Sequence, residues 1–181
     1  NITQTLVGGN YAITAKIPAG LIKMKVEYGT NTVVLNTVTN IMCGDAYIVD
    51  GQSNAVADND AGYSNQWIRS YGSMGGSTAP GWGMAVAWSG QGDNYRIGVW
   101  EMYMASNLVA TCKVPICIIN GAVGGTRIDV HQRGGTIYNA ISNRVTMAML
   151  THGIRAFLWH QGENNSAADG PDGDWDYKFY Q

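Results

Sequence analysis

The chain has 181 residues, of which 45% are hydrophobic and 13% are charged, and its formal net charge is −2. This length supports a hydrophobic core, and the high apolar content with low net charge excludes a disordered chain. Without a basic excess the chain has little with which to neutralise phosphates, so we expect no nucleic-acid partner and no anionic membrane partner. No apolar run approaches the roughly 18 residues that a membrane span needs.

The chain begins at Asn1 rather than Met, so we expect that a leader was removed or that the natural start lies upstream. Its 24 Gly, 6 Trp and 10 Tyr beside few charges are typical of a secreted carbohydrate-active protein. We therefore expect a secreted or periplasmic location. Cys43, Cys112 and Cys117 lie in or beside apolar stretches, and their odd number favours buried thiols over a disulfide framework.

The first part of the chain has the alternation of β-strands. Alternating apolar and polar residues predict strands over 11–17 and 21–28, and a turn at Asn31-Thr32 precedes a third over 33–42. So few strands cannot bury both of their faces alone. We interpret residues 1–42 as the end of a β-sandwich whose beginning is absent, or as a sheet packed on the rest of the chain.

The rest of the chain has the pattern of a parallel α/β sheet. Continuous apolar runs at 46–49, 114–119 and 154–159 predict strands buried on both faces, and residues 55–93 are rich in loop-forming residues. Apolar residues at helical spacing separate these runs: Ile97, Trp100, Met104, Leu108 and Cys112, then Ile137, Ile141, Val145 and Met149. Helix limits are predicted at Asp93 or Asn94, at Lys113, and at His152-Gly153. This order of elements is the signature of a parallel sheet.

Ligands of open parallel sheets bind beyond the carboxyl ends of the strands. The segments 50–55, 120–127 and 160–164 follow the predicted strands, so we expect all of them at one edge. Ser53 stands at a strand-to-helix turn and is a candidate nucleophile, although a Ser in such a turn is also a common helix cap. The backbone N–H groups of Gly124-Gly125 and the amide of Gln161 are candidate oxyanion donors, or else an ordinary turn and a loop hydrogen bond.

Together these segments resemble a known family. The runs Gly44-Asp45, Gly51-Gln52-Ser53-Asn54, Gly124-Gly125-Thr126-Arg127-Ile128 and 159–164 resemble the sialate O-acetylesterases and acetyl xylan esterases of the SGNH hydrolase superfamily. The resemblance implies a flavodoxin-like parallel sheet preceded by a partial β-sandwich. Residues 43–181 would then be the N-terminal portion of a hydrolase domain. It implies no metal and no organic cofactor.

The resemblance also implies roles for particular residues. Ser53 would be the nucleophile that accepts the acyl group, and Gly125 and Gln161 would complete the oxyanion hole. Glu163 would be a buried carboxylate that braces the site. We further expect three residues to contact the substrate: Asn54, Arg127 and His131.

The base of the family is a His near the C-terminus with an Asp three residues before it, and this chain contains only His131, His152 and His160. His152 is predicted to cap a helix, and His131 lacks an Asp at the family spacing. His160 stands where relatives often have Tyr. We therefore expect the C-terminal part of the enzyme to be missing from this chain. The base and its Asp would come from that segment or from a second chain, and this chain alone would be nearly inactive.

The leading hypothesis is therefore a serine esterase that removes O-acetyl groups from a carbohydrate, either a sialate or a plant polysaccharide. The alternative is a catalytically incomplete carbohydrate-binding protein, with Trp67, Trp82, Trp88 and Trp159 stacking on sugar rings. An esterase acting on other esters is a third possibility. The acidic cluster of Asp169, Asp172, Asp174 and Asp176 lacks the Gly and Glu of an EF-hand loop, so we interpret it as a solvated loop.

Overall fold

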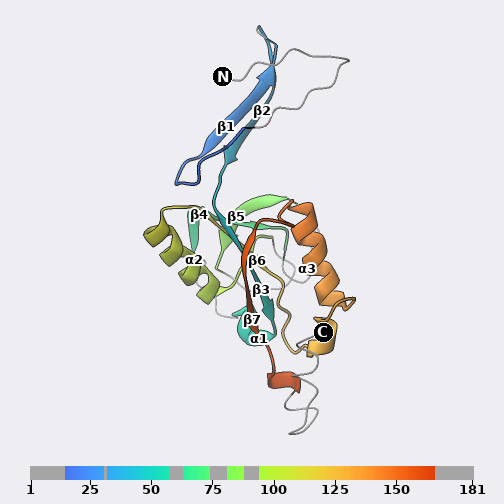
Figure 1. Ribbon diagram of the computed structural model, residues 1–181. Helices are drawn as coiled ribbons and strands as arrows, with labels where there is room; N and C mark the ends of the chain where they lie inside the picture. Colours follow the sequence, from blue (N-terminus) through green and yellow to red (C-terminus); the bar gives the residue numbers. More distant parts are fainter. Residues whose placement is uncertain (1–14, 31, 58–62, 74–80, 88–93, 166–181) are drawn as a thin grey trace.

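The computed structural model describes residues 15–30, 32–57, 63–73, 81–87 and 94–165. These residues form a five-stranded sheet and a separate two-stranded sheet, which projects away from the larger one (Figure 1). The order in the larger sheet is β5 (Trp82–Val86), β4 (Ser64–Tyr71), β6 (Ile116–Asn120), β3 (Asp45–Gly51) and β7 (Ile154–His160).

Neighbouring strands among β4, β6, β3 and β7 run parallel, and only β5 is antiparallel to its neighbour. The predicted parallel α/β architecture is thus confirmed, with a mixed sheet. The stretch 55–93 was predicted to be rich in loops, and its described part also contains the strands β4 and β5, which the sequence did not predict. The sequence of β4, SNQWIRSY, carries too few apolar residues to resemble a buried strand.

Two helices cover opposite faces of the larger sheet, α2 (Val99–Cys112) and α3 (Thr136–Met147) (Figure 1). Successive strand residues point to opposite faces. Ile116 and Ile118 of β6 therefore share a core cluster with Met102 and Val109 of α2. The intervening β6 residues, Cys117 and Ile119, pack instead with Ile137, Ile141 and Val145 of α3.

The limits of α2 differ in part from the prediction. The helix starts after Gly98 rather than Asn94, and Asp93 lies outside the described residues. It ends as predicted at Lys113, which caps it in the left-handed conformation at φ 57°. Cys112 is exposed and Cys43 is partly exposed, so only Cys117 is the buried thiol that we predicted.

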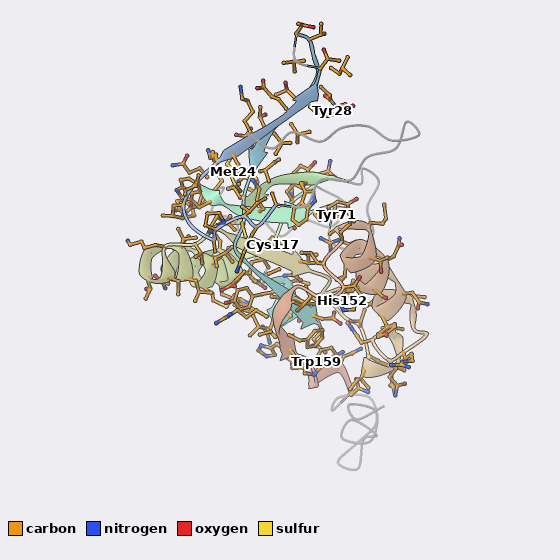
Figure 2. The ribbon with its side chains drawn as sticks, turned by 45° about the horizontal axis from the view of Figure 1, so that its top comes forward. Met24, Tyr28, Tyr71, Cys117, His152 and Trp159 are labelled. Atoms are coloured by element: carbon orange, nitrogen blue, oxygen red, sulfur yellow. The ribbon has the colours of Figure 1, made fainter. Side chains whose placement is uncertain are left out.

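The end of α3 also differs from the prediction. The helix ends at Met147 with Ala148 as its C-cap, so His152 does not cap it and lies instead in the exposed turn before β7 (Figure 2). Met149, predicted to continue the apolar stripe, is 90% exposed because it lies beyond the helix. Of the predicted stripe, Ile137, Ile141 and Val145 are buried.

The strand β7 was predicted to be buried on both faces, and this is wrong for one of them. In the part of the chain that the structure describes, β7 pairs with β3 alone and forms an edge of the sheet. Its alternate residues are exposed, Phe157 by 53%. The apolar run therefore predicted the strand but not its position in the sheet.

The smaller sheet consists of β1 (Met24–Gly29) and β2 (Val34–Ile41), which pair antiparallel with Val26 opposite Val38. It matches the predicted strands over 33–42 and the second half of 21–28. Of the strand predicted over 11–17, residues 15–17 are not in a strand and the rest lie outside the described residues. Val26, Val34 and Val38 are each about half exposed, at 47%, 58% and 49%. A boundary between two domains near residue 43 remains a prediction.

Candidate active site

The three segments predicted to converge do meet at the carboxyl edge of the sheet. Because β3, β6 and β7 are parallel, their following loops leave from the same edge. The backbone N–H of Gln52 donates to His160 O at 3.0 Å, and that of Val123 donates to Gly51 O at 3.1 Å. The turn after β3 is therefore held between the other two loops.

A tight turn places Ser53 at the start of the short helix α1 (Ser53–Val56), with an exposed side chain. Gly51 in this turn has φ 138°, and a Cβ there would lie 1.9 Å from His160 O, so only glycine fits. The N-cap is Gln52, whose side chain makes no capping hydrogen bond. Ser53 is thus the first helical residue and not the cap, which removes the alternative of a capping Ser.

Hydrogen bonds from other elements hold α1 in place. The amide Nδ2 of Asn120 donates to Ala55 O at 2.8 Å, and the indole Nε1 of Trp100 donates to Asn54 O at 3.0 Å. The side-chain oxygen of Gln52 accepts from the backbone N–H of Asn164 at 3.0 Å. The residue that precedes Ser53 and the residues that follow it are therefore each bonded to another element.

The glycine pair lies beside Ser53. A Cβ built on Gly124 would be 4.0 Å from Ser53 Cβ, and Gly125 adopts φ 71°, which favours glycine. Gly125 O accepts from Asn164 Nδ2 at 2.9 Å. Among the described residues, neither Gly124 N–H nor Gly125 N–H donates a hydrogen bond. The glycine loop thus lies close to the exposed Ser53, and its two backbone donors have no partner among the described residues.

Gln161 is buried and bridges two of the loops. Its Nε2 donates to Thr126 O at 2.8 Å, and its Oε1 accepts from the N–H of Gly162 at 2.7 Å. A primary amide has two N–H donors, so one remains after the bond to Thr126. In this structure Gln161 braces the glycine loop, and its contribution to an oxyanion hole stays a prediction.

Glu163 was predicted to be a buried carboxylate, but its side chain is 43% exposed, because it lies on the last turn at the rim of the site. It accepts a short hydrogen bond from Asn54 Nδ2, and its Oε1 lies 3.4 Å from His160 Nε2. Glu163 therefore contacts the helix that carries Ser53, as expected of a bracing residue, but from the surface. The side chain of Asn54, predicted to contact substrate, is engaged by this contact.

The two other residues predicted to contact the substrate differ in their exposure. Arg127 is partly exposed, and its Nε lies 3.6 Å from Asp129 Oδ1. His131 follows the one-turn 3-10 helix η1 (Ile128–Val130) and is only 1% exposed at its side chain. Its ring lies between Asp50 and Thr126, and contact of His131 with a substrate stays a prediction.

Two cavities lie in the described part of the chain, and Ser53 lines neither of them. One, of about 530 Å³, lies between α3 and β7 and is lined among others by His131, Ile141, Phe157 and Trp159. The other, of about 470 Å³, lies at the opposite edge of the sheet, where Asp45, Trp82 and Pro115 line it. Ser53 and the glycine loop thus lie at the rim formed by the carboxyl edge of the sheet, outside these two cavities.

Sequence reasoning missed the buried polar network under this rim. Asn120 Nδ2 also donates to Glu101 Oε1 at 2.9 Å, and burial raises the pKa of Glu101 to about 9. Arg144 donates to Asn120 O at 2.6 Å and to Tyr71 O at 2.7 and 3.0 Å, and burial lowers its pKa to about 10. The available signal in the sequence was a charged residue directly beside an apolar residue of each predicted helix stripe. Glu101 follows Trp100, and Arg144 precedes Val145.

Within the described ranges, no group of three or more His, Cys, Asp or Glu residues is arranged to hold a metal ion. The aspartate cluster at 169–176 lies outside these ranges. None of the described helices has the length and apolar character of a membrane span.

The fold and the site can now be compared with those of known proteins. A mostly parallel sheet is covered on both faces by helices, and Ser53 stands at a strand-to-helix turn beside a glycine loop. A family model described as carbohydrate esterase, sialic acid-specific acetylesterase, matches residues 86–181, which is more than half of the chain. The chain therefore belongs to this family. The match includes Gly125 and Gln161 but not Ser53.

Solved structures with the same fold share little sequence with the chain. A protein from Arabidopsis thaliana superimposes with a TM-score of 0.56 and 18% identity, over 76% of this chain and 66% of that chain. A carbohydrate acetylesterase from Xanthomonas citri gives a TM-score of 0.54 and 19% identity, over 82% of this chain and 39% of that chain. The chain thus spans between 39% and 66% of these structures. No curated protein sequence matches it.

Proposed function

We propose that this chain carries the nucleophile and the oxyanion donors of a carbohydrate O-acetylesterase that works through an acyl-enzyme. The observation that supports this most directly is the exposed hydroxyl of Ser53 beside Gly124, whose N–H, like that of Gly125, is unused among the described residues. A nucleophile needs this combination, because the charge that develops on the ester oxygen must be met by donors already in place.

In the proposed reaction, Ser53 Oγ attacks the acetyl carbonyl carbon and the C=O π electrons move to the carbonyl oxygen. The resulting oxyanion accepts hydrogen bonds from Gly125 N–H, Ser53 N–H and the remaining N–H of Gln161. Each such donor typically lowers the barrier by about 3–4 kcal/mol. The intermediate collapses as the base passes the proton taken from Ser53 to the sugar oxygen, which leaves as a hydroxyl. Water, deprotonated by the same base, then attacks the acetyl-serine to release acetate.

The reaction also needs a base to accept the proton of Ser53, and we propose a His paired with an Asp from a missing C-terminal segment or a second chain. The described histidines are poorly suited to this role. Both ring nitrogens of His131 are engaged by buried partners, and His152 lies in the turn before β7. His160 is exposed beside Glu163, and its ring makes no hydrogen bond with Ser53 among the described residues. The chain alone is therefore proposed to be nearly inactive.

The proposed substrate is an O-acetylated carbohydrate, such as a sialate or a plant polysaccharide, met in a secreted or periplasmic location. The description of the matching family and the carbohydrate acetylesterase among the similar structures support this class. The proposed reaction needs no metal or organic cofactor, since every group in it is a protein donor or nucleophile. No nucleic acid or membrane has a part in it.

The test is hydrolysis of an aryl acetate and of acetylated sialic acid and xylan by the full-length protein. Ser53→Ala is expected to lower kcat by at least about 10³-fold, as loss of a nucleophile does. Ser142→Ala, which removes an exposed hydroxyl on α3, is the matched control and should keep full activity. Equal turnover by the Ser53→Ala and parent proteins refutes the proposal. Tight binding of an acetylated sugar without hydrolysis favours the carbohydrate-binding alternative.

A further inference from the structure

Three side chains under the glycine loop are joined by hydrogen bonds. His131 Nδ1 lies 3.0 and 3.1 Å from the two carboxyl oxygens of Asp50, and His131 Nε2 lies 2.9 Å from Thr126 Oγ1. The Thr126 hydroxyl donates in turn to Val123 O at 2.6 Å. The side chains of Asp50 and His131 are 3% and 1% exposed, so water does not replace these contacts.

The protons of this series can be counted. A carbonyl oxygen only accepts, so the single hydrogen of the Thr126 hydroxyl points to Val123 O. The same hydroxyl can then only accept from His131, which requires a hydrogen on Nε2. Asp50 Oδ1 also accepts the backbone N–H of Gly51 at 2.8 Å. One further hydrogen must lie between Asp50 and His131 Nδ1, and we place it on the imidazole nitrogen because it is more basic than a carboxylate oxygen.

We propose that His131 is an imidazolium, protonated at both nitrogens, and that the series Asp50–His131–Thr126 is the device that positions the glycine loop for the reaction proposed above. The positioning role rests on that proposed function, whereas the protonation state does not. His131 is a positioning residue, because it acts through Thr126 and touches neither Ser53 nor the substrate.

A neutral ring fits these distances less well. With a hydrogen on Nδ1 alone, Nε2 would need the Thr126 hydrogen that Val123 O already receives at 2.6 Å. With a hydrogen on Nε2 alone and Asp50 ionised, Nδ1 would face two carboxylate oxygens at 3.0 and 3.1 Å with no hydrogen between them. Arg133 borders the same cavity as His131, but it is exposed, so solvent screens its charge.

The series acts on the residues that flank the oxyanion donors. Val123 and Thr126 enclose Gly124-Gly125, and the Thr126 hydroxyl ties the two ends together. Asp50 anchors the other end of the series at Gly51, in the turn that presents Ser53. The turn that presents Ser53 and the loop that carries Gly124-Gly125 are thus connected through His131. A shift of one is therefore resisted by the other. Displacement of a reacting group by about 1 Å can cost about 10²-fold in rate.

The protonation state is tested by nitrogen NMR of the histidine rings in the full-length protein at neutral pH, with His131→Gln used for assignment. Both nitrogens of His131 are expected at imidazolium shifts with attached protons. A single nitrogen at the shift of an unprotonated ring overturns this part of the proposal. The readout does not depend on any esterase activity.

The positioning role is tested by a pair of variants at one site. Thr126→Val keeps the shape of the side chain but removes the hydroxyl, whereas Thr126→Ser keeps the hydroxyl. On an aryl acetate, Thr126→Val is expected to lower kcat by about 10- to 100-fold with KM within about threefold, and Thr126→Ser to stay within about threefold of the parent. His152→Gln, in the exposed turn before β7, is the control for loss of a histidine.

Equal kcat for a folded Thr126→Val variant and the parent overturns the positioning role. If Thr126→Val does not fold, Thr126→Ala removes the same hydroxyl with less bulk and is judged by the same criterion. If Ser53→Ala abolishes turnover and the Thr126 variants keep the kcat of the parent, the positioning role fails while the proposed function stands. When Ser53→Ala leaves turnover unchanged, the proposed function fails, and the NMR result still decides the protonation of His131.

Discussion

Replacement of Glu101 by Gln is expected to remove a large contribution to the dependence of stability on pH between pH 4.5 and about 9. Glu101 lies on α2, is fully buried, and accepts a hydrogen bond from Asn120 Nδ2 at 2.9 Å. Its second oxygen, Oε2, has no hydrogen-bond partner among the described residues. Burial without a cation beside it disfavours the ionised form, which raises the pKa of Glu101 from 4.5 to about 9.

The sign and size of the effect come from proton linkage. Between pH 4.5 and about 9 the folded protein holds a proton on Glu101 that the unfolded chain has released. The free energy of unfolding therefore falls as pH rises through this window, by at most about 1.4 kcal/mol per pH unit. From pH 4.5 to pH 7 this amounts to about 3 kcal/mol. A neutral Gln keeps the acceptor for Asn120 and has no proton to lose.

Urea unfolding of the full-length protein, followed by circular dichroism at several pH values between 5 and 8, measures this slope. Glu101→Gln is expected to flatten it, and Glu27→Gln, which removes an exposed carboxylate, is expected to leave it unchanged. Equal slopes for Glu101→Gln and the parent protein would refute the reasoning, because Glu101 would then be ionised in its buried position.

Further predictions concern the residues around the rim. Asp50→Asn removes the buried partner of His131 and should lower the free energy of unfolding by about 3–5 kcal/mol in urea titrations, whereas Asp129→Asn, which removes an exposed carboxylate, should change it little. Gly51→Ala places a Cβ 1.9 Å from His160 O at φ 138°, so its melting temperature should fall well below that of Gly134→Ala, which has positive φ but an open neighbourhood. Gly124→Ala puts a methyl group 4.0 Å from Ser53 Cβ in ordinary contact, so it should fold normally while lowering kcat/KM on acetylated substrates; unchanged kcat/KM would contradict the position of the glycine loop.

The sequence predicted the elements whose apolar pattern is strong. The run at 114–119 became the fully buried β6, and the spacing of Ile137, Ile141 and Val145 gave the inner face of α3. It missed β4, because a strand with Ser, Asn, Gln and Arg side chains has no apolar run, and its position in the sheet depends on pairing with β6 and β5. Exposure of β7 at an edge is likewise set by neighbours and not by its own residues.

Convergence of the loops at the rim could be predicted because parallel strands leave at one edge, whatever their sequence. The pairing of Asp50 with His131 could not, because 81 positions separate them and only the path of η1 brings the ring under β3. The prediction that Glu163 is buried was wrong for a related reason. A motif gives the type of residue, whereas burial depends on how the last described turn lies against α1.

The central claim is that Ser53 is an activated nucleophile beside ready oxyanion donors. Covalent labelling of the full-length protein with a fluorophosphonate, followed by mass mapping of the modified peptide, tests it most directly. The account predicts one label per molecule on Ser53 and none in Ser53→Ala. A label on any other residue, or no label on an active protein, would contradict it.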